Sequence, residues 1–212
     1  MTTRAGLFNA LPDFAFAAVF LVTWIAPLAL GDQMVKWLML VMLMEFIVIH
    51  SAAFMGNVAL SGAGRLKRGT SILGLGAFYT LFAGGFSLAF RSWWPITSFW
   101  IQTLNRLLGA IVGQVPSEEQ KAFIMRGWAA SAVLYILGVM ATLLLPVPRL
   151  GLTAQVIAAQ HLTGGGAWVE QPQKVIAFGF LYFSLIGWSE LHAHAWAGQR
   201  KPPQAPGPAT TP

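Results

Sequence analysis

Long apolar runs separated by short polar segments dominate the hydropathy pattern of this chain. A helix needs about 20 mostly apolar residues to cross the hydrocarbon core of a membrane. Charged, proline or tryptophan residues, which are typical of membrane boundaries, end these runs. Five segments qualify: residues 12–30, 34–60, 69–90, 127–145 and 175–196. The pattern predicts an all-α protein, a polytopic bundle of transmembrane helices.

Two further segments compete for the place of a sixth span. Residues 96–111 carry apolar side chains on one face and polar ones on the other, the pattern of an interfacial amphipathic helix. A true span with a polar stripe facing the bundle has the same pattern. Residues 152–169 are apolar but interrupted by glutamine, histidine and three glycines, which favours a short, broken or re-entrant helix. We expect about six spans plus one interfacial or re-entrant helix.

The basic residues predict an orientation, because lysine and arginine concentrate in cytoplasmic loops. The excess of basic residues on one side is larger if residues 96–111 cross the membrane than if residues 152–169 do. The amphipathic pattern of residues 96–111 favours the opposite choice, and the two topologies stay open. Both place the two termini in the cytoplasm of a multi-pass protein. We expect its location to be the cell membrane, an inner or plasma membrane.

Composition excludes several classes of protein. Only 9% of the residues are charged and 56% are hydrophobic, whereas a soluble domain is about 25% charged. The chain has no cysteine, which excludes disulfides, iron–sulfur clusters and covalent c-type haem. The net charge of +6 is explained by basic loops, so we expect a lipid bilayer as partner and no nucleic acid. Residues 1–197 form one transmembrane domain, and residues 198–212 form a proline-rich cytoplasmic tail.

Ionisable residues inside the predicted spans are the candidates for function. Each costs about 2.5–3.5 kcal/mol to insert at the centre of a span, so it needs a partner, a cavity or a function. At 1.5 Å per residue, His50 lies about 21 Å beyond Lys36, and Glu190 lies about 24 Å beyond Lys174 in a helix of the same direction. These two side chains therefore share a level in the membrane, and His194 follows Glu190 on the same helix face.

The trio of His50, Glu190 and His194 supplies the nitrogen and oxygen ligands that hold a divalent transition metal such as zinc, iron, manganese or copper. The same side chains would serve as a proton relay. A purely structural hydrogen-bonded pair of His50 and Glu190 is the third interpretation. The sequence therefore gives a candidate metal site but leaves these three roles open.

A second candidate polar site consists of Glu45, His161 and Arg106, and its composition depends on topology. If residues 96–111 cross the membrane, Arg106 reaches the level of Glu190 and becomes its ion-pair partner. If residues 152–169 cross instead, His161 reaches the level of Glu45 and the two form a pair. Two polar sites at different depths would indicate a conduction path, whereas one would indicate a structural clamp or a metal centre.

The C-terminal half carries a resemblance to a known family. Arg149, the segment His-Leu-Thr-Gly-Gly at residues 161–165 and a last span ending Glu-Leu-His-Ala-His at residues 190–194 resemble an uncharacterised family of prokaryotic polytopic membrane proteins. Glu45 is also similar to an acidic residue early in that family. In this chain the glycines follow Thr163 at once, where the family pattern has intervening apolar residues. The resemblance implies that residues 152–169 enter the membrane, and it carries over candidate positions without a mechanism.

These observations lead to two expectations for function. The first is an integral membrane protein with a buried Glu/His site that binds a metal ion or relays protons, as a small transporter or a membrane enzyme. The second is a structural or accessory subunit of a larger membrane complex, in which the buried polar residues only hold the helices together. Glycines at helical spacing allow close helix packing, which is compatible with a homo-oligomer or a larger complex.

Overall fold

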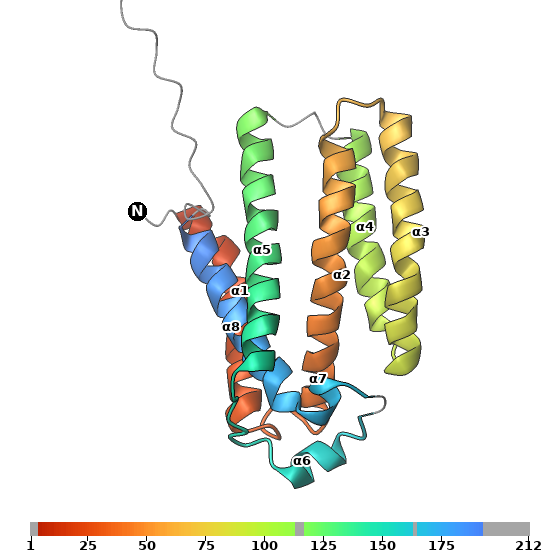
Figure 1. Ribbon diagram of the computed structural model, residues 1–212. Helices are drawn as coiled ribbons and strands as arrows, with labels where there is room; N and C mark the ends of the chain where they lie inside the picture. The colour runs from red at the N-terminus through yellow and green to blue at the C-terminus, as the bar shows by residue number, and fades with distance from the viewer. Residues whose placement is uncertain (1–3, 113–116, 163–164, 193–212) are drawn as a thin grey trace, which may run out of the picture.

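The computed structural model describes residues 4–112, 117–162 and 165–192, and every regular element in these ranges is a helix. Figure 1 shows long helices standing side by side with two short helices near one end. The elements in chain order are α1 (Arg4–Ile25), α2 (Met34–Leu60), α3 (Arg65–Ala89), α4 (Trp94–Val112), α5 (Glu118–Leu144), α6 (Ala154–Ala159), α7 (Ala167–Glu170) and α8 (Pro172–Leu191).

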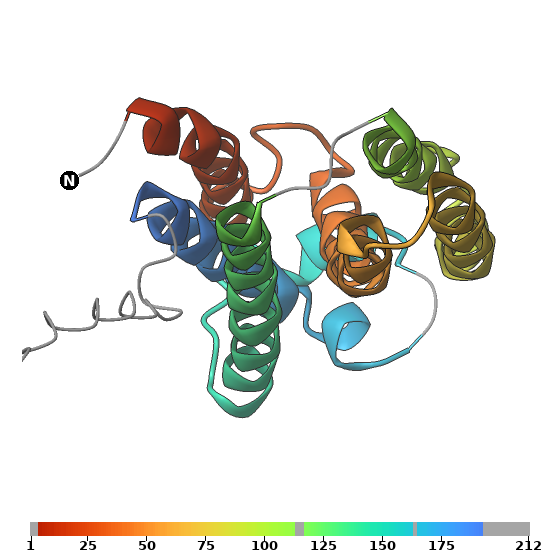
Figure 2. The same ribbon diagram turned by 90° about the horizontal axis from the view of Figure 1, so that it is seen from above.

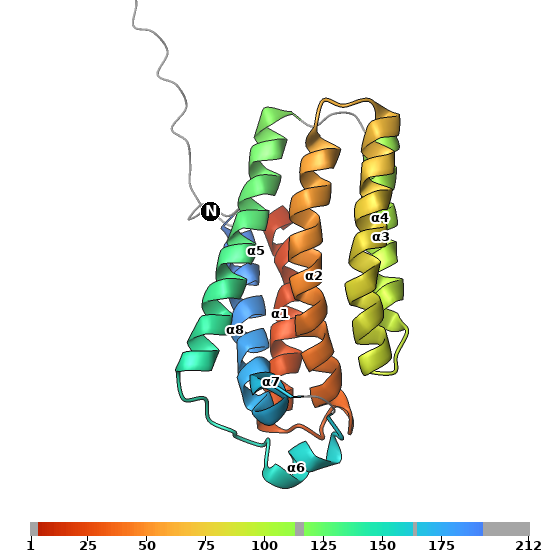
Figure 3. The ribbon, with the colours of Figure 1, turned by 45° about the vertical axis from the view of Figure 1, so that its right-hand side comes forward.

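Five of the helices are long and apolar enough to cross a membrane: α1 from Gly6 onward, α2, α3, α5 and α8. They correspond to the five spans that the hydropathy pattern predicts. The helix α4 is not among them, although it runs beside α3 over most of its length (Figure 3). The predicted all-α bundle is thus confirmed, and the described residues hold five candidate spans rather than the expected six.

Local chemistry moves the ends of several helices away from the predicted limits. The first span was expected over residues 12–30, but α1 begins at Arg4, contains Pro12 and ends at Ile25. Pro27 cannot continue a helix because its ring blocks the backbone of the preceding turn. At the start of α5, Gln120 N–H donates a hydrogen bond to Ser117 Oγ, and Ser117 N–H donates one to Gln120 Oε1. This capping box begins α5 at Glu118, upstream of residue 127, where the hydropathy pattern begins the span.

The helices pack around two centres that share α2. One apolar core joins α1, α2, α5 and α8, and the other joins α2, α3 and α4. Figure 2, seen along the bundle, shows α2 between the α3–α4 pair and the remaining long helices. The closest pair is α1 with α8, where Gly179 lies against the Phe20 ring and Gly187 against the Phe14 ring. The missing side chains at these glycines allow the two helices to approach.

Residues 152–169 form no helix long enough to cross a membrane within the described part of the segment. They contain only α6 and α7, of six and four residues, and Figures 1 and 3 place α6 beyond the ends of the long helices. The Gln160 side chain, 1% exposed, fixes α6 by donating to the Asp32 carbonyl oxygen over 2.6 Å. The arrangement favours the topology in which residues 96–111, and not residues 152–169, run the length of the bundle.

Candidate functional site

Glu45 lies inside the bundle and is held by a tyrosine from another helix. The hydroxyl of Tyr182 in α8 donates a hydrogen bond to Glu45 Oε1 over 2.7 Å. Tyr182 is only 2% exposed, and its ring packs edge-on against the rings of Tyr135 and Phe183. Ser131 of α5 makes a further hydrogen bond with the Tyr182 hydroxyl. Ser131 of α5, Tyr182 of α8 and Glu45 of α2 are therefore joined by consecutive hydrogen bonds.

Arg106 of α4 contacts α2 further along the helix and acts on Glu45 electrostatically. Its Nη1 donates to Ser51 Oγ over 3.0 Å and lies 3.7 Å from Met55 Sδ. The guanidinium also attracts the Glu45 carboxylate electrostatically. Opposite charges attract far more strongly in a poorly solvated interior than in water. The buried acid on α2 is thus placed between a hydroxyl donor on α8 and a cation on α4.

A second pair of acids lies between α1 and α8. The carboxyl groups of Asp13 and Glu190 lie within hydrogen-bonding range of each other. Glu190 Oε2 is buried and has no hydrogen-bond donor among the described residues. The close approach at Gly187, where an added Cβ would lie 3.1 Å from the Phe14 ring, brings the two helices together at this level. Two ionised carboxylates only accept hydrogen bonds, so this contact needs a proton or a cation between them.

The two acidic groups are electrostatically linked. Asp13 interacts with both Glu190 and Glu45, and the Tyr182 hydroxyl interacts with Asp13 as well as with Glu45. All of these side chains project from α1, α2 and α8, around the same packing centre. We call Asp13, Glu45, Tyr182 and Glu190 the carboxyl cluster. Its three acids are half-buried between the helices, and Arg106 is within electrostatic range of Glu45.

The predicted metal ligands lie in different surroundings. His50 is exposed, and its Nδ1 lies 3.0 Å from the Phe46 carbonyl oxygen. Its ring lines a groove of about 430 Å³ between α2 and α5, together with Trp128 and Tyr135. Glu190 contacts Asp13 instead. His194 lies outside the described residues, and within them no group of three or more histidine, aspartate or glutamate side chains is placed to hold a metal ion. The metal site stays a prediction.

The structure brings two residues of the second predicted site, Glu45 and Arg106, within electrostatic range of each other. The third, His161, lies apart from them. Glu45 and Arg106 interact as described. Arg106 makes its hydrogen bond with Ser51 rather than with Glu190, the partner expected from depth. His161 is exposed in the turn after α6, with a left-handed backbone φ of 47°. The segment that carries His161 thus lies at the end of the bundle, away from its long helices.

Sequence reasoning missed two members of the carboxyl cluster. Asp13 was treated as a boundary residue because Pro12 was taken as the start of the span, whereas α1 begins two turns earlier. Tyr182 was not considered, although its hydroxyl stands within an apolar helix and needs a partner there. Counting from Ile25 would have placed Asp13 about 18 Å into the helix, deep enough to be a candidate.

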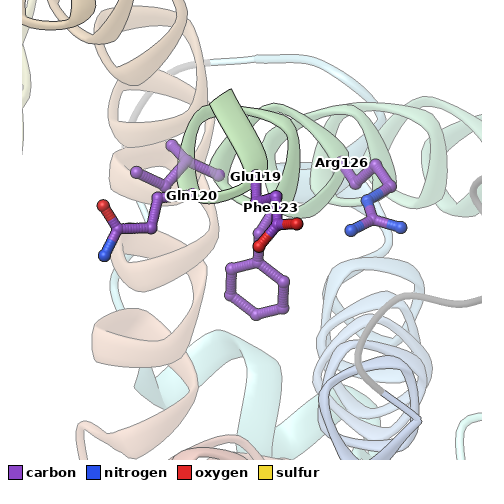
Figure 4. A pocket seen from close by; sticks show the side chains of 5 residues that line it. Glu119, Gln120, Phe123 and Arg126 are labelled. Atoms are coloured by element: carbon purple, nitrogen blue, oxygen red, sulfur yellow. The ribbon is translucent and has the colours of Figure 1, made fainter. Parts of the chain in front are cut away.

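Other hollows in the described residues lack a comparable set of groups. A wide hollow of about 640 Å³ borders the first turns of α5, where Figure 4 shows Glu119, Phe123 and Arg126 projecting from the helix. All of its lining residues come from that one helix. A third hollow, of about 370 Å³, lies between α2, α5 and the α7 segment and is mostly apolar. Neither encloses a group of acids.

Comparisons with protein-family models, with curated proteins and with solved structures find no match to this chain. The class is defined by the fold itself: five helices have the length and composition of membrane spans, and the described residues form an all-helical bundle. The chain is consistent with an integral membrane protein that holds an acidic cluster in its interior.

Proposed function

We propose that this membrane protein binds and releases protons at the carboxyl cluster, as a small transporter or a membrane enzyme. The observation that carries the proposal is the contact between the carboxyl groups of Asp13 and Glu190. Two like charges at hydrogen-bonding range in a poorly solvated site repel strongly. One shared proton removes this repulsion and turns the contact into a hydrogen bond.

A proton suits this site better than a metal ion. A transition metal is usually held by three or more protein ligands, and the described residues place no such group together. Two facing carboxyl groups are sufficient to hold a proton, as paired acids do in enzymes that share one proton between them. A divalent metal bound by His50, Glu190 and His194 stays the alternative for the cofactor, because His194 lies outside the described residues.

The hydroxyl contacts supply a route for the proton. Tyr182 donates to Glu45, and Ser131 can donate to the Tyr182 oxygen in turn. Protons move along such chains when each hydroxyl passes one hydrogen on and accepts another. Glu45 interacts with Asp13, which links this chain to the acid pair. The proposed route therefore joins α5, α8, α2 and α1 through the middle of the bundle.

Proton flux into proteoliposomes tests the proposal. The full chain is reconstituted with a pH-sensitive dye inside the vesicles, and a pH gradient with a potassium and valinomycin clamp drives the flux. Asp13→Asn and Glu190→Gln should each reduce the protein-dependent flux to the level of empty vesicles. Glu119→Gln, which changes an exposed acid in the first turn of α5, is the matched control and should keep the flux.

Infrared difference spectroscopy tests the shared proton without requiring transport. The wild type should have a band from a protonated carboxyl group at neutral pH, and Asp13→Asn should remove or shift that band. If neither variant changes the carboxyl bands or the flux, the proton-binding proposal is wrong. A change in the bands without any flux would favour an enzyme or a sensor over a transporter.

A structural or accessory subunit is the second candidate function. It is favoured by the way polar side chains connect helices: the Trp128 indole donates to the Ile49 carbonyl oxygen over 2.9 Å, and the Tyr135 hydroxyl donates to that of Met42 over 2.8 Å. The exposed apolar side chains of α5, including Ile136, would contact lipid or the helices of a partner subunit. Loss of stability in the acid variants with unchanged infrared bands would support this function.

The orientation of the protein in the membrane is part of the same proposal. The α2–α3 loop and the start of α5 lie at one end of the bundle (Figure 1), and this end includes the basic residues Arg65, Lys67, Arg68 and Lys121. The positive-inside rule would place that end in the cytoplasm of a cell membrane. The resemblance to a prokaryotic family is compatible with a bacterial inner membrane.

A further inference from the structure

The turn between α3 and α4 borders a cavity that belongs to neither the carboxyl cluster nor the groove at His50. Its volume is about 450 Å³. The cavity is lined by Ser87 and Leu88 from the last turn of α3, by Arg91, Ser92 and Trp93 from the turn, and by Ile96 from the first turn of α4. Figure 3 shows this turn at one end of the bundle, where a membrane span meets the headgroup region.

An arginine occupies the position in this turn where glycine is usual. Arg91 has a left-handed φ of 51°. Its backbone N–H bonds the Leu88 carbonyl oxygen, and the Ser92 N–H bonds that of Ser87. This pair of bonds is the Schellman motif, whose left-handed residue is most often glycine because a Cβ is unfavourable there. The chain tolerates that cost, and Arg91 is one of the residues that line the cavity.

The groups around the cavity are donors without acceptors. The Ser87 hydroxyl is buried without a hydrogen-bond partner among the described residues, and Ser87 is only 4% exposed. The Arg91 side chain makes no hydrogen bond or ion pair within the described ranges. In the first turn of α4, Trp94 and Ile96 carry backbone N–H groups without an intrahelical acceptor, whereas Pro95 between them has no N–H. Trp93, the residue before the helix, offers no side-chain acceptor because an indole only donates.

We propose that this cavity binds the phosphate of a membrane-lipid headgroup. Arginine, a hydroxyl and the N–H groups of a helix N-terminus are the donors that hold phosphate in proteins. Leu88 and Trp93, 77% and 75% exposed, stand beside these donors and offer apolar surface to the acyl chains. Tryptophan is enriched at this depth of a membrane. Phosphate could also come from solution, and the acyl-chain contacts make the lipid the proposed source.

Retention of lipid by the detergent-solubilised full chain tests the proposal. Native mass spectrometry measures how much of the protein carries one phosphatidylglycerol molecule during a titration. Arg91→Gly should weaken binding about tenfold or more, the effect of losing a charge-assisted bond. Because glycine relieves the left-handed backbone, this variant should fold at least as well as the wild type. Ser87→Ala should weaken binding by a smaller factor, about threefold to fivefold.

Arg149→Gln is the matched control, because it removes one positive charge from an exposed residue at the same end of the bundle. It should leave binding within twofold. If Arg91→Gly and Arg149→Gln bind phosphatidylglycerol equally well, the proposed site is wrong and the lipid is attracted only by general charge.

Binding of two further ligands distinguishes a lipid phosphate from a phosphate in solution. Diacylglycerol, which has the acyl chains without the phosphate, should not respond to Arg91→Gly. Inorganic phosphate should compete with the lipid only at a far higher concentration. If inorganic phosphate binds as tightly as phosphatidylglycerol and depends equally on Arg91, the cavity is a site for a free anion and the lipid proposal is overturned.

Discussion

Replacing Tyr182 with phenylalanine removes one hydroxyl from the carboxyl cluster and leaves the ring in place. The ring is 2% exposed and packs against the rings of Tyr135, Phe178 and Phe183, so the apolar core should not change. Glu45 Oε1 loses the donor that lies 2.7 Å away. The variant therefore removes the hydrogen bond between α8 and α2, together with the one that Ser131 of α5 makes with the same hydroxyl.

The size of the effect depends on the charge of Glu45. A hydrogen bond to a charged group contributes about 1.5–3 kcal/mol to stability, and one between neutral groups about 0.5–1.5 kcal/mol. Interhelical hydrogen bonds in membrane proteins average about 0.6 kcal/mol, with a maximum near 1.7 kcal/mol. We therefore expect a loss of about 1–2 kcal/mol in the free energy of unfolding, with the upper end for an ionised Glu45 carboxylate and the lower end for a neutral carboxyl group.

A double-mutant cycle measures this interaction directly. The free energy of unfolding is determined in bicelles, by steric trapping or by titration with dodecyl sulfate, for the wild type, Tyr182→Phe, Glu45→Met and the double variant. Glu45→Met removes the acceptor and leaves Arg106 without its acid in both the single and the double variant, so that cost cancels. Tyr135→Phe, which loses only a bond to a neutral carbonyl oxygen, is the control and should cost about 1 kcal/mol.

The expected coupling energy between Tyr182 and Glu45 is about 1–2 kcal/mol. A value within about 0.5 kcal/mol of zero, the usual error of additivity between independent sites, would refute the idea that this bond stabilises the cluster. A coupling near 0.6 kcal/mol would mean that the Glu45 carboxyl is neutral in the folded protein.

Three further predictions concern the helices that position the cluster. Gly179→Ala should lower the free energy of unfolding by about 1–3 kcal/mol, because a Cβ there overlaps the Phe20 ring. At Gly85 a Cβ meets no atom within 4 Å, so Gly85→Ala should raise the free energy of unfolding by up to about 1 kcal/mol. Chemical unfolding in bicelles compares the two variants. Ser117→Ala should cost about 1 kcal/mol and speed hydrogen exchange in the first turn of α5, while Ser117→Asp should restore protection. Gln160→Leu should cost about 0.5–1.5 kcal/mol by removing the hydrogen bond to the Asp32 carbonyl oxygen, and proteolysis after α6 should become faster. Unchanged proteolysis would mean that this bond does not fix α6.

Hydropathy predicted the spans well because length and apolarity are properties of one segment at a time. The limits of α1 were wrong for a local reason. The expected span began at residue 12 and continued past Pro27, whereas α1 contains Pro12 and ends at Ile25, two residues before Pro27. A proline in a membrane helix is tolerated when its neighbours satisfy the freed backbone group. The residue type alone does not decide between these two roles.

The candidate site was harder to predict because depth gives only one of three coordinates. Counting residues placed His50 and Glu190 at one level, but it said nothing about the direction in which each side chain leaves its helix. His50 lines the α2–α5 groove, whereas Glu190 contacts Asp13 of α1. Helix rotation is set by packing, here by Gly187 against Phe14. Such contacts join segments that are far apart in sequence and leave no periodic signal.

The position of α2 explains how the two halves of the bundle can influence each other. One side of α2 carries Glu45 toward Tyr182 and the core shared with α1, α5 and α8. Six residues further along, Ser51 holds Arg106 of α4, about 9 Å away along the helix axis. Because Arg106 also attracts Glu45, a proton that neutralises Glu45 weakens the attraction between α2 and α4. Protonation on one side of α2 would then loosen the α3–α4 pair on the other side, which gives a proton-binding cluster a mechanical consequence.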